Sequence, residues 1–322
     1  SAVTYTLDDS ADDAGDTFAV SFATSDDVTN ASEASHVSLT LAGVDADAAS
    51  VSVSIDDPSP APAIVRSATK VGDAWVVSDV DLTSLSEGTI TVTATVTDAA
   101  GNTATATDTL TLDTVANEVP SVTIDAVSSD TDDADTSDFV TNQSSVTVTG
   151  TLSASLAAGQ TVEYSVDGGA NWTTLAESGI SGTSLSFAEI DATTAPSIQV
   201  RVVDAAGNAG STVVQALSYD GTAPSVSITS TAGAITTSNA GSVTISGTAE
   251  AGASIQLALA GTDISGATAT ADANGHWSVA TVDVSAFGAL TATATDAAGN
   301  TGTSSAVTYT LDDSADDAGD TF

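Results

Sequence analysis

Carboxylates are the side chains with which this sequence could do chemistry. The chain of 322 residues has 43 Asp and Glu against 3 Lys and Arg, which gives a formal net charge of -40. Carboxylates packed together without a cation repel each other and raise one another's pKa. Ca2+ accepts about six to eight oxygen ligands in loose geometry, whereas Mg2+ requires a tight octahedron. Either a saline environment screens this charge or bound cations neutralise it. The acids are mostly Asp and gather with Gly and Asn in turn-like stretches, which favours bound cations, and we expect Ca2+ there.

The most regular acidic pattern is Asp-Ala-Ala-Gly-Asn, which occurs at 98–102, 204–208 and 296–300. The copies are about 100 residues apart, which is the size of a small β-sandwich. Each copy follows an alternating run that predicts a strand, and a second strand ending in Asp follows it. We therefore place each motif at the tip of the last hairpin of a domain. The alternating runs are Thr89–Thr97, Ser197–Val203 and Leu290–Thr295, and the closing residues are Asp113, Asp220 and Asp312.

A longer repeat encloses these motifs. Residues 1–18 and 305–322 are identical, so the sequence recurs at an offset of 304 residues. Chance does not produce an identity of this length, and we infer one repeat unit plus the start of the next, in an array whose length matters. Neighbouring identical repeats of the same chain are the predicted partners.

Composition and spacing predict an all-β protein. Val, Ala, Leu and Ile set among Thr and Ser suit pleated, half-buried strands better than helices. Pro120–Ile124 and Pro224–Ile228 match each other and open two domains, whereas Phe18–Phe22 opens the first. We expect tandem immunoglobulin-like β-sandwiches joined by short linkers into an extended, monomeric rod. Their expected ranges are 1–113, 114–220 and 221–312, with 313–322 as the start of the next repeat.

Several functions are excluded by what the sequence lacks. No His-Glu-x-x-His, P-loop or Gly-x-Ser-x-Gly pattern occurs, so we expect no enzyme and no small-molecule substrate. Binding to nucleic acid or to an anionic membrane requires clustered Lys and Arg. The chain has only 3 such residues, so both are excluded as partners. No apolar run approaches the roughly 18 residues that span a membrane. Cys is absent, so disulfides cannot stabilise the domains.

The last domain resembles the bacterial Ig-like repeats of large secreted adhesins in three stretches, Gly247–Gly252, Asp272–Ser278 and Thr295–Asn300. Tyr164–Trp172 resembles another variant of that family. The first domain keeps Trp75 and Thr97–Asn102 but lacks the Gly-Thr-Ala-Glu signature. The resemblance implies an extender region of a giant RTX-type (repeats-in-toxin) adhesin, exported by a type I system to the outside of the cell, with Ca2+ at the domain junctions.

Strand direction is expected to gather the acids at these junctions. In a seven-stranded sandwich the domain entry, the B–C loop and the F–G tip lie at one end, because the strands alternate in direction. Asp220, Glu250 and Asp296 then meet where the third domain begins. The predicted ligands at the second domain are Asp113, Asn117, Glu118 and Asp204, and those at the first are Asp8, Asp9, Asp45, Asp47 and Asp98. Asp312, which closes the third domain, completes the set.

Each of these features also has a structural interpretation. The Asp of the five-residue motif either binds an ion or only builds a hairpin turn with Gly or Asn at positive φ, and its Asn is interpreted as a turn residue. The acidic run 130–138 is either a ligand loop or a solvated one, and Asp272 is interpreted as a turn residue. The three tryptophans are interpreted as core residues, and the isolated His36 and His276 as structural. The tryptophans are Trp75, Trp172 and Trp277.

Three functions remain open at this point. The favoured one is a structural extender, stiffened by Ca2+ at its junctions, that holds a distal binding domain away from the cell surface. The alternatives are a module that binds a glycan or a surface, and a subunit of a surface layer or filament. Tandem identity favours the extender, because a binding domain at the tip of an adhesin is usually unique.

Overall fold

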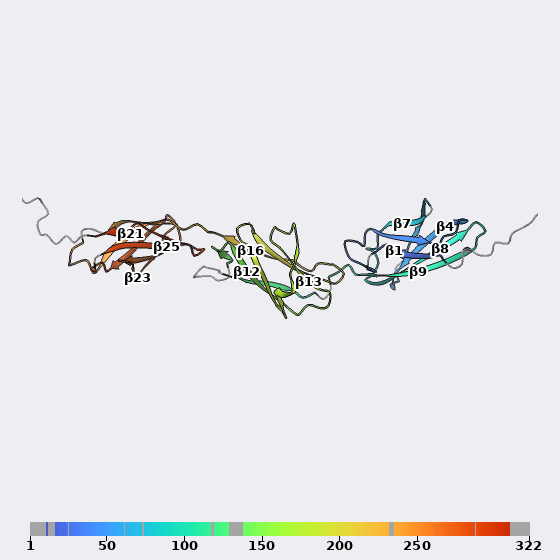
Figure 1. Cartoon of the computed structure of the whole chain (residues 1–322), viewed down its shortest axis with the longest axis horizontal. Helices are drawn as coiled ribbons and strands as arrows, with labels where there is room; N and C mark the ends of the chain where they lie inside the picture. Colours follow the sequence, from blue (N-terminus) through green and yellow to red (C-terminus); the bar gives the residue numbers. More distant parts are fainter. Residues whose placement is uncertain are drawn as a thin grey trace, which may run out of the picture. The chain divides into compact units, whose positions relative to one another are not determined.

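The computed structural model describes residues 11, 17–24, 26–60, 62–72, 74–116, 119–128, 138–231, 235–286 and 288–309. These residues form two compact units. The first contains those within 1–121, 153–163 and 201–212, and the second those within 122–152, 164–200 and 213–322. Strands make up nearly all of the regular structure drawn in Figure 1, and the helical content of the described residues is one short 3-10 turn, η1 (Glu177–Gly179). The all-β prediction is confirmed.

The first set of strands builds two sheets from residues 19–112. One sheet has the order β1-β3-β7-β6 and the other the order β2-β9-β8-β4-β5. In the second sheet β2 runs parallel to β9. The strands are β1 (Ala19–Phe22), β2 (Val28–Thr29), β3 (Val37–Ala42), β4 (Ala48–Asp56), β5 (Ile64–Ser67), β6 (Thr69–Val71), β7 (Ala74–Val80), β8 (Gly88–Asp98) and β9 (Thr103–Leu112).

Side-chain alternation explains why these two sheets pack on each other. In β8 the apolar residues from Ile90 to Val96 face inward, and the threonines between them face outward. The outward threonines lie opposite those of β9, as in the pair Thr93 and Thr107, and such cross-strand pairs stabilise a sheet. The core between the sheets is buried, and its fully buried large members include Leu39, Ile55, Leu82, Ile90 and Leu110.

The second set of strands repeats the same order over residues 122–219. Its sheets are β10-β12-β16-β15 and β14-β13-β17-β18, and β11 pairs in parallel with β19. Phe187 is fully buried, and its ring packs edge-on against that of Tyr164, with 5.4 Å between the ring centres. The strands are β10 (Val122–Val127), β11 (Val140–Thr141), β12 (Ser145–Leu152), β13 (Thr161–Ser165), β14 (Thr173–Thr174), β15 (Ile180–Ser181), β16 (Ser184–Asp191), β17 (Ser197–Val203), β18 (Val213–Ala216) and β19 (Ser218–Tyr219).

The third set covers residues 226–308. Its sheets are β20-β21-β24 and β23-β22-β25-β26, and β27 pairs with β25. Ile245 and Trp277 from the first sheet meet Ile255 and Leu290 from the second in one core. The strands are β20 (Val226–Thr231), β21 (Val243–Ala249), β22 (Ser254–Leu259), β23 (Thr262–Thr270), β24 (His276–Val282), β25 (Ala289–Thr295), β26 (Thr301–Thr303) and β27 (Val307–Thr308).

A bulge recurs at the same place in all three sets. Asp79, Glu189 and Thr281 have positive φ, and each lies where the register shifts on β7, β16 or β24. Two residues further on, an Asp accepts hydrogen bonds from the N–H and hydroxyl of a following Thr or Ser. The three pairs are Asp81 with Thr83, Asp191 with Thr193 and Asp283 with Ser285. The three sets are therefore copies of one design.

The tryptophans differ in burial. Trp277 is 3% exposed, which confirms its interpretation as a core residue. Trp75 packs against the first core but is only partly buried, and the Lys70 Nζ lies 5.8 Å from its ring centre. Trp172 is half-buried. In the part of the chain that the structure describes, no helix has the length and apolar character needed to cross a membrane.

Candidate junction sites

The Asp-Ala-Ala-Gly-Asn motif forms the same turn each time. In the first copy the Oδ1 of Asp98 accepts hydrogen bonds from the N–H groups of Gly101 and Asn102, at 2.6 and 2.8 Å. Its Oδ2 accepts a third from the Asn102 side chain, at 2.7 Å. The Asp and Asn bond in the same way in the other two copies. Glycine is required at the fourth position because φ there is +96°, +94° and +77° at Gly101, Gly207 and Gly299.

The Asp of each motif therefore holds its own turn together. Burial acts against the charged form of Asp98, but the hydrogen bonds from Asn102 and Gly101 outweigh it and keep the pKa of Asp98 below its usual value. After these bonds the Oδ2 of Asp98 keeps a lone pair, whereas its Oδ1 already accepts two hydrogen bonds. The turn interpretation thus describes what the Asp does within the chain, and its role as a Ca2+ ligand stays a prediction.

The Asn of the second motif reaches into the preceding set of strands. Asn208 is 5% exposed. Its Nδ2 donates to the carbonyl oxygen of Asp113 at 2.9 Å, and its Oδ1 accepts from the Ala31 N–H at 2.9 Å. All three residues belong to the first unit. Asn208 therefore clamps the end of β9 and the loop after β2 to the β17–β18 turn, a role that the sequence did not suggest.

The third motif makes part of the same contact within the second unit. The Nδ2 of Asn300 donates to the carbonyl oxygen of Asp220 at 2.8 Å. Asp220 itself accepts the Thr222 N–H at 2.9 Å. In both junctions the closing Asp of one domain therefore contributes its main-chain carbonyl to the next.

Three carboxylates line one cavity beside the Asn208 clamp, and two of them lie near enough to raise the pKa of the third, although the three are not close enough together to hold a metal ion. Asp113 has a raised pKa because it is partly desolvated and because Asp204 and then Glu87 place negative charge near it. A cavity of about 370 Å³ opens among these three residues. The sequence did not point to Glu87. It lies near Asp113 because the next residue, Gly88, pairs with Leu112, which directly precedes Asp113. Its Oε2 accepts the Thr114 N–H at 2.9 Å.

The remaining predicted ligands lie at the expected loops where they are described. Asp45 and Asp47 are in the β3–β4 loop, next to Ala48, which pairs with Asp98. Glu250 is in the β21–β22 loop, near the end of β25 that carries Asp296. Within the described ranges no three His, Cys, Asp or Glu side chains come close enough together to hold a metal ion. Asp8, Asp9, Asn117, Glu118 and Asp312 lie outside the described residues, as does most of the acidic run 130–138.

Acid titration is expected to act on the junction and on the turns in opposite directions. Asp113 has a raised folded pKa, so its charge opposes folding at neutral pH, and acidification towards 3.8 relieves that cost. Hydrogen bonds from Ser59 and then Ser86 lower the pKa of Asp57 from 3.8 to about 2. Its contribution to stability is full above pH 3.8 and is lost as the pH falls through about 2. The free energy of unfolding, measured by urea titration, should fall steeply only between pH 3.8 and about 2.

Two variants separate the windows. Asp113→Asn should remove the contribution of Asp113 above pH 3.8. Asp57→Asn should make the profile below pH 3.8 less steep, although not flat, because Asp167 also has a pKa lowered to about 2 and still titrates there. A lower window that stays equally steep in Asp57→Asn would contradict the assignment to that carboxylate.

Comparisons with protein families match two parts of the chain. Residues 4–114 match a model described as a bacterial Ig-like domain, and residues 230–313 match one described as a bacterial Ig domain. The search of curated proteins gave no match.

Several solved structures are similar to the chain. One is a structure described as giving insight into the host cell surface retention of a 1.5-MDa bacterial ice-binding adhesin. It is 28% identical over 92% of this chain and 98% of that chain, with a TM-score of 0.34. A tetra-tandem repeat in the extending region of a large adhesion protein is 24% identical over 91% and 74%, with a TM-score of 0.28. Domains of titin are 12% identical over 90% and 99%, with a TM-score of 0.33.

Proposed function

We propose that this chain, which belongs to the bacterial Ig-like domains over residues 4–114 and 230–313, is a spacer in a cell-surface adhesin. In this role a run of domains outside the cell holds a distal binding domain away from the surface. The observation that carries the proposal is the identity of residues 1–18 with residues 305–322. Near-identical long repeats are typical of arrays in which length is the selected property.

The junction contacts support this function. Asn208 and Asn300 occupy the same position of the same motif, and each bonds the main-chain carbonyl of the Asp that closes the preceding domain. A contact to a main-chain carbonyl does not depend on the preceding side chain, so the same joint can be made wherever the motif recurs. The resemblance of Gly247–Gly252 and Thr295–Asn300 to adhesin repeats supports an RTX-type adhesin exported by a type I system.

Ca2+ is proposed to stiffen these joints. Asp113, Asp204 and Glu87 carry uncompensated negative charge beside one joint, as the raised pKa of Asp113 indicates. An ion that binds only the folded junction stabilises it by about 2.7 kcal/mol when its free concentration is 100 times the dissociation constant. Millimolar extracellular Ca2+ fills even weak oxygen sites of the extracellular class. The array would thus be flexible during export and stiff outside the cell.

Removal of Ca2+ is therefore expected to loosen and destabilise the chain. The melting temperature should fall by roughly 10–20 °C when millimolar Ca2+ is replaced by chelator, since each kcal/mol shifts a domain of this size by about 4–8 °C. Small-angle scattering should show broader flexibility in the chelator. Equal melting temperature and equal flexibility in both buffers would contradict the Ca2+ mechanism and leave the spacer function without its proposed stiffening.

A matched pair of variants locates the ion at the third domain. Asp296→Ala should lower the number of bound Ca2+ ions, measured by calorimetry, because Asp296 is a predicted ligand with Asp220 and Glu250. Asp263→Ala removes the same charge from the β22–β23 hairpin, where β22 ends away from the junction, and should leave the number unchanged. Equal stoichiometry in the two variants would refute the ligand assignment.

A further inference from the structure

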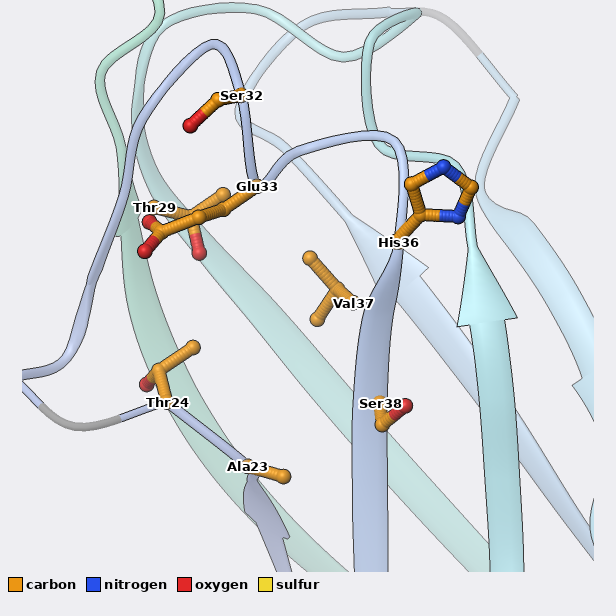
Figure 2. A pocket seen from close by; sticks show the side chains of 8 residues that line it. All are labelled: Ala23, Thr24, Thr29, Ser32, Glu33, His36, Val37 and Ser38. Carbon is orange, nitrogen blue, oxygen red and sulfur yellow. The ribbon is translucent and has the colours of Figure 1, made fainter. Parts of the chain in front are cut away.

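Thr29 is a buried threonine whose hydroxyl lacks a hydrogen-bond partner among the described residues. It is fully closed to solvent, and within the described ranges nothing bonds to its Oγ1. The same is true of the Oγ1 of Thr24. Both residues line a cavity of about 500 Å³, together with Glu33 and His36. Figure 2 shows the Glu33 carboxylate and the Thr29 hydroxyl on the same side of the loop that carries Ser32, whereas the His36 ring points away. A buried hydroxyl without a partner is unfavourable, so its presence requires an explanation.

The second domain contains the same threonine with its partner in place. Thr141 is fully buried, like Thr29, and both residues lie at the end of the parallel strand that pairs with the last strand of the domain. Their carbonyls each accept the N–H of the closing residue, Asp113 or Asp220, at 3.0 Å. The Thr141 Oγ1 accepts the Gln143 N–H, two residues on, at 3.1 Å.

In the first domain the corresponding N–H is used elsewhere. Two residues after Thr29, the Ala31 N–H donates to Asn208 Oδ1 of the next domain at 2.9 Å. The Asn208 clamp therefore takes the donor that the Thr29 hydroxyl would otherwise receive. When the junction closes, the Ala31 N–H bonds to Asn208, and the Thr29 hydroxyl is left without this donor.

We propose that Asn208 Oδ1 and Thr29 Oγ1 are alternative acceptors for the Ala31 N–H, in the closed and open states of this junction. The cavity beside Thr29 gives the loop between β2 and β3 the space to move as the donor changes partner. Thr29 then opposes closure, because its hydroxyl is satisfied only when the junction opens. The inference rests on the proposed function in one respect, which is that the stiffness of the joint matters.

The position accepts an aliphatic side chain, so the exchange can be tested without unfolding the domain. Ala34 and Ala240 make equivalent contacts in their domains. The N–H of each donates to the carbonyl four residues before it, and the carbonyl of each accepts the N–H of the residue directly after the repeated Asp. This alignment places Ile235, which is buried, where Thr29 lies. Thr29→Val is therefore expected to fold.

The test compares two matched threonine variants of the full chain, in chelator. Thr29→Val should slow hydrogen exchange at the Ala31 amide by about tenfold and narrow the distance distribution between spin labels at Ser52→Cys and Ser186→Cys. The labels are specific because the chain has no Cys. Thr141→Val removes a bond that is made, so exchange at Gln143 should accelerate and the label distances should stay unchanged. If Thr29→Val alters neither Ala31 exchange nor the label distances, the proposal is overturned.

The Asn208→Ala background provides the decisive control. Without the Asn208 acceptor, the Ala31 N–H depends on Thr29, so adding Thr29→Val should now accelerate its exchange instead of slowing it. A change of the same sign in both backgrounds would mean that Thr29 acts only through core packing and would overturn the proposal. Because no Ca2+ is present, this sign reversal is independent of the metal mechanism, and either one can fail while the other holds.

Discussion

Gly247→Ala is expected to destabilise the third domain strongly and leave the stability of the other domains unchanged. Gly247 lies on β21, between Ile228 of β20 and Trp277 of β24. A Cβ there would overlap the Ser227 carbonyl oxygen and the Trp277 ring. The strand is held on both sides, so it cannot move away. We expect a loss of about 3 kcal/mol or more, a large share of the roughly 5–15 kcal/mol that stabilises a domain.

Tryptophan fluorescence can assign this unfolding to its domain, because the chain has 3 Trp and each predicted domain contains one. Trp75→Phe and Trp172→Phe leave Trp277 as the reporter, and its unfolding midpoint in urea should fall sharply with Gly247→Ala. Gly241→Ala is the matched control, since a Cβ at Gly241 meets nothing within 4 Å. Equal midpoints for the two alanine variants would show that the close contact at Gly247 is not limiting.

Trp277→Ala is expected to cost the third domain about 3–5 kcal/mol, the usual range for a large buried aromatic side chain. Trp277 is 3% exposed and packs against the core on the β20-β21-β24 sheet. Trp75 occupies the equivalent register on β7, opposite Leu41, but it is only partly buried. Trp75→Ala should therefore destabilise the first domain by clearly less. The measurement is urea unfolding by circular dichroism, and an equal loss in both variants would contradict the burial argument.

Strand alternation and the repeated motif made the architecture predictable. Runs such as Thr89–Thr97 alternate at period two, and they lie on β8 and its copies. The tandem Ig-like prediction is confirmed by the family matches at 4–114 and 230–313. The breaks in the last strands, between β18 and β19 and between β26 and β27, were not predictable, because the hydrophobic pattern does not report where main-chain pairing stops.

The candidate site was only partly predictable. The turn position of Asp98, Asp204 and Asp296 follows from their spacing to Gly and Asn. The hydrogen bond from Asn208 to Asp113 could not be predicted from the sequence, because its acceptor is a main-chain carbonyl and every residue has one. Glu87 was missed because it lies next to Asp113 across the sheet and far from it along the chain. The Ca2+ ligands themselves stay predictions.

The parallel pairing of the second strand with the last has a consequence for mechanical load. In the first domain Asp113 and Thr111 donate their N–H groups to Thr29 and Asp27, and in the second Asp220 and Ser218 donate theirs to Thr141 and Phe139, all at 3.0 Å. A pull on the two ends of either domain drags these parallel strands in opposite directions. The hydrogen bonds are then loaded together in shear and cannot open one at a time, so the short strands β2 and β11 would set the force at which the first two domains give way.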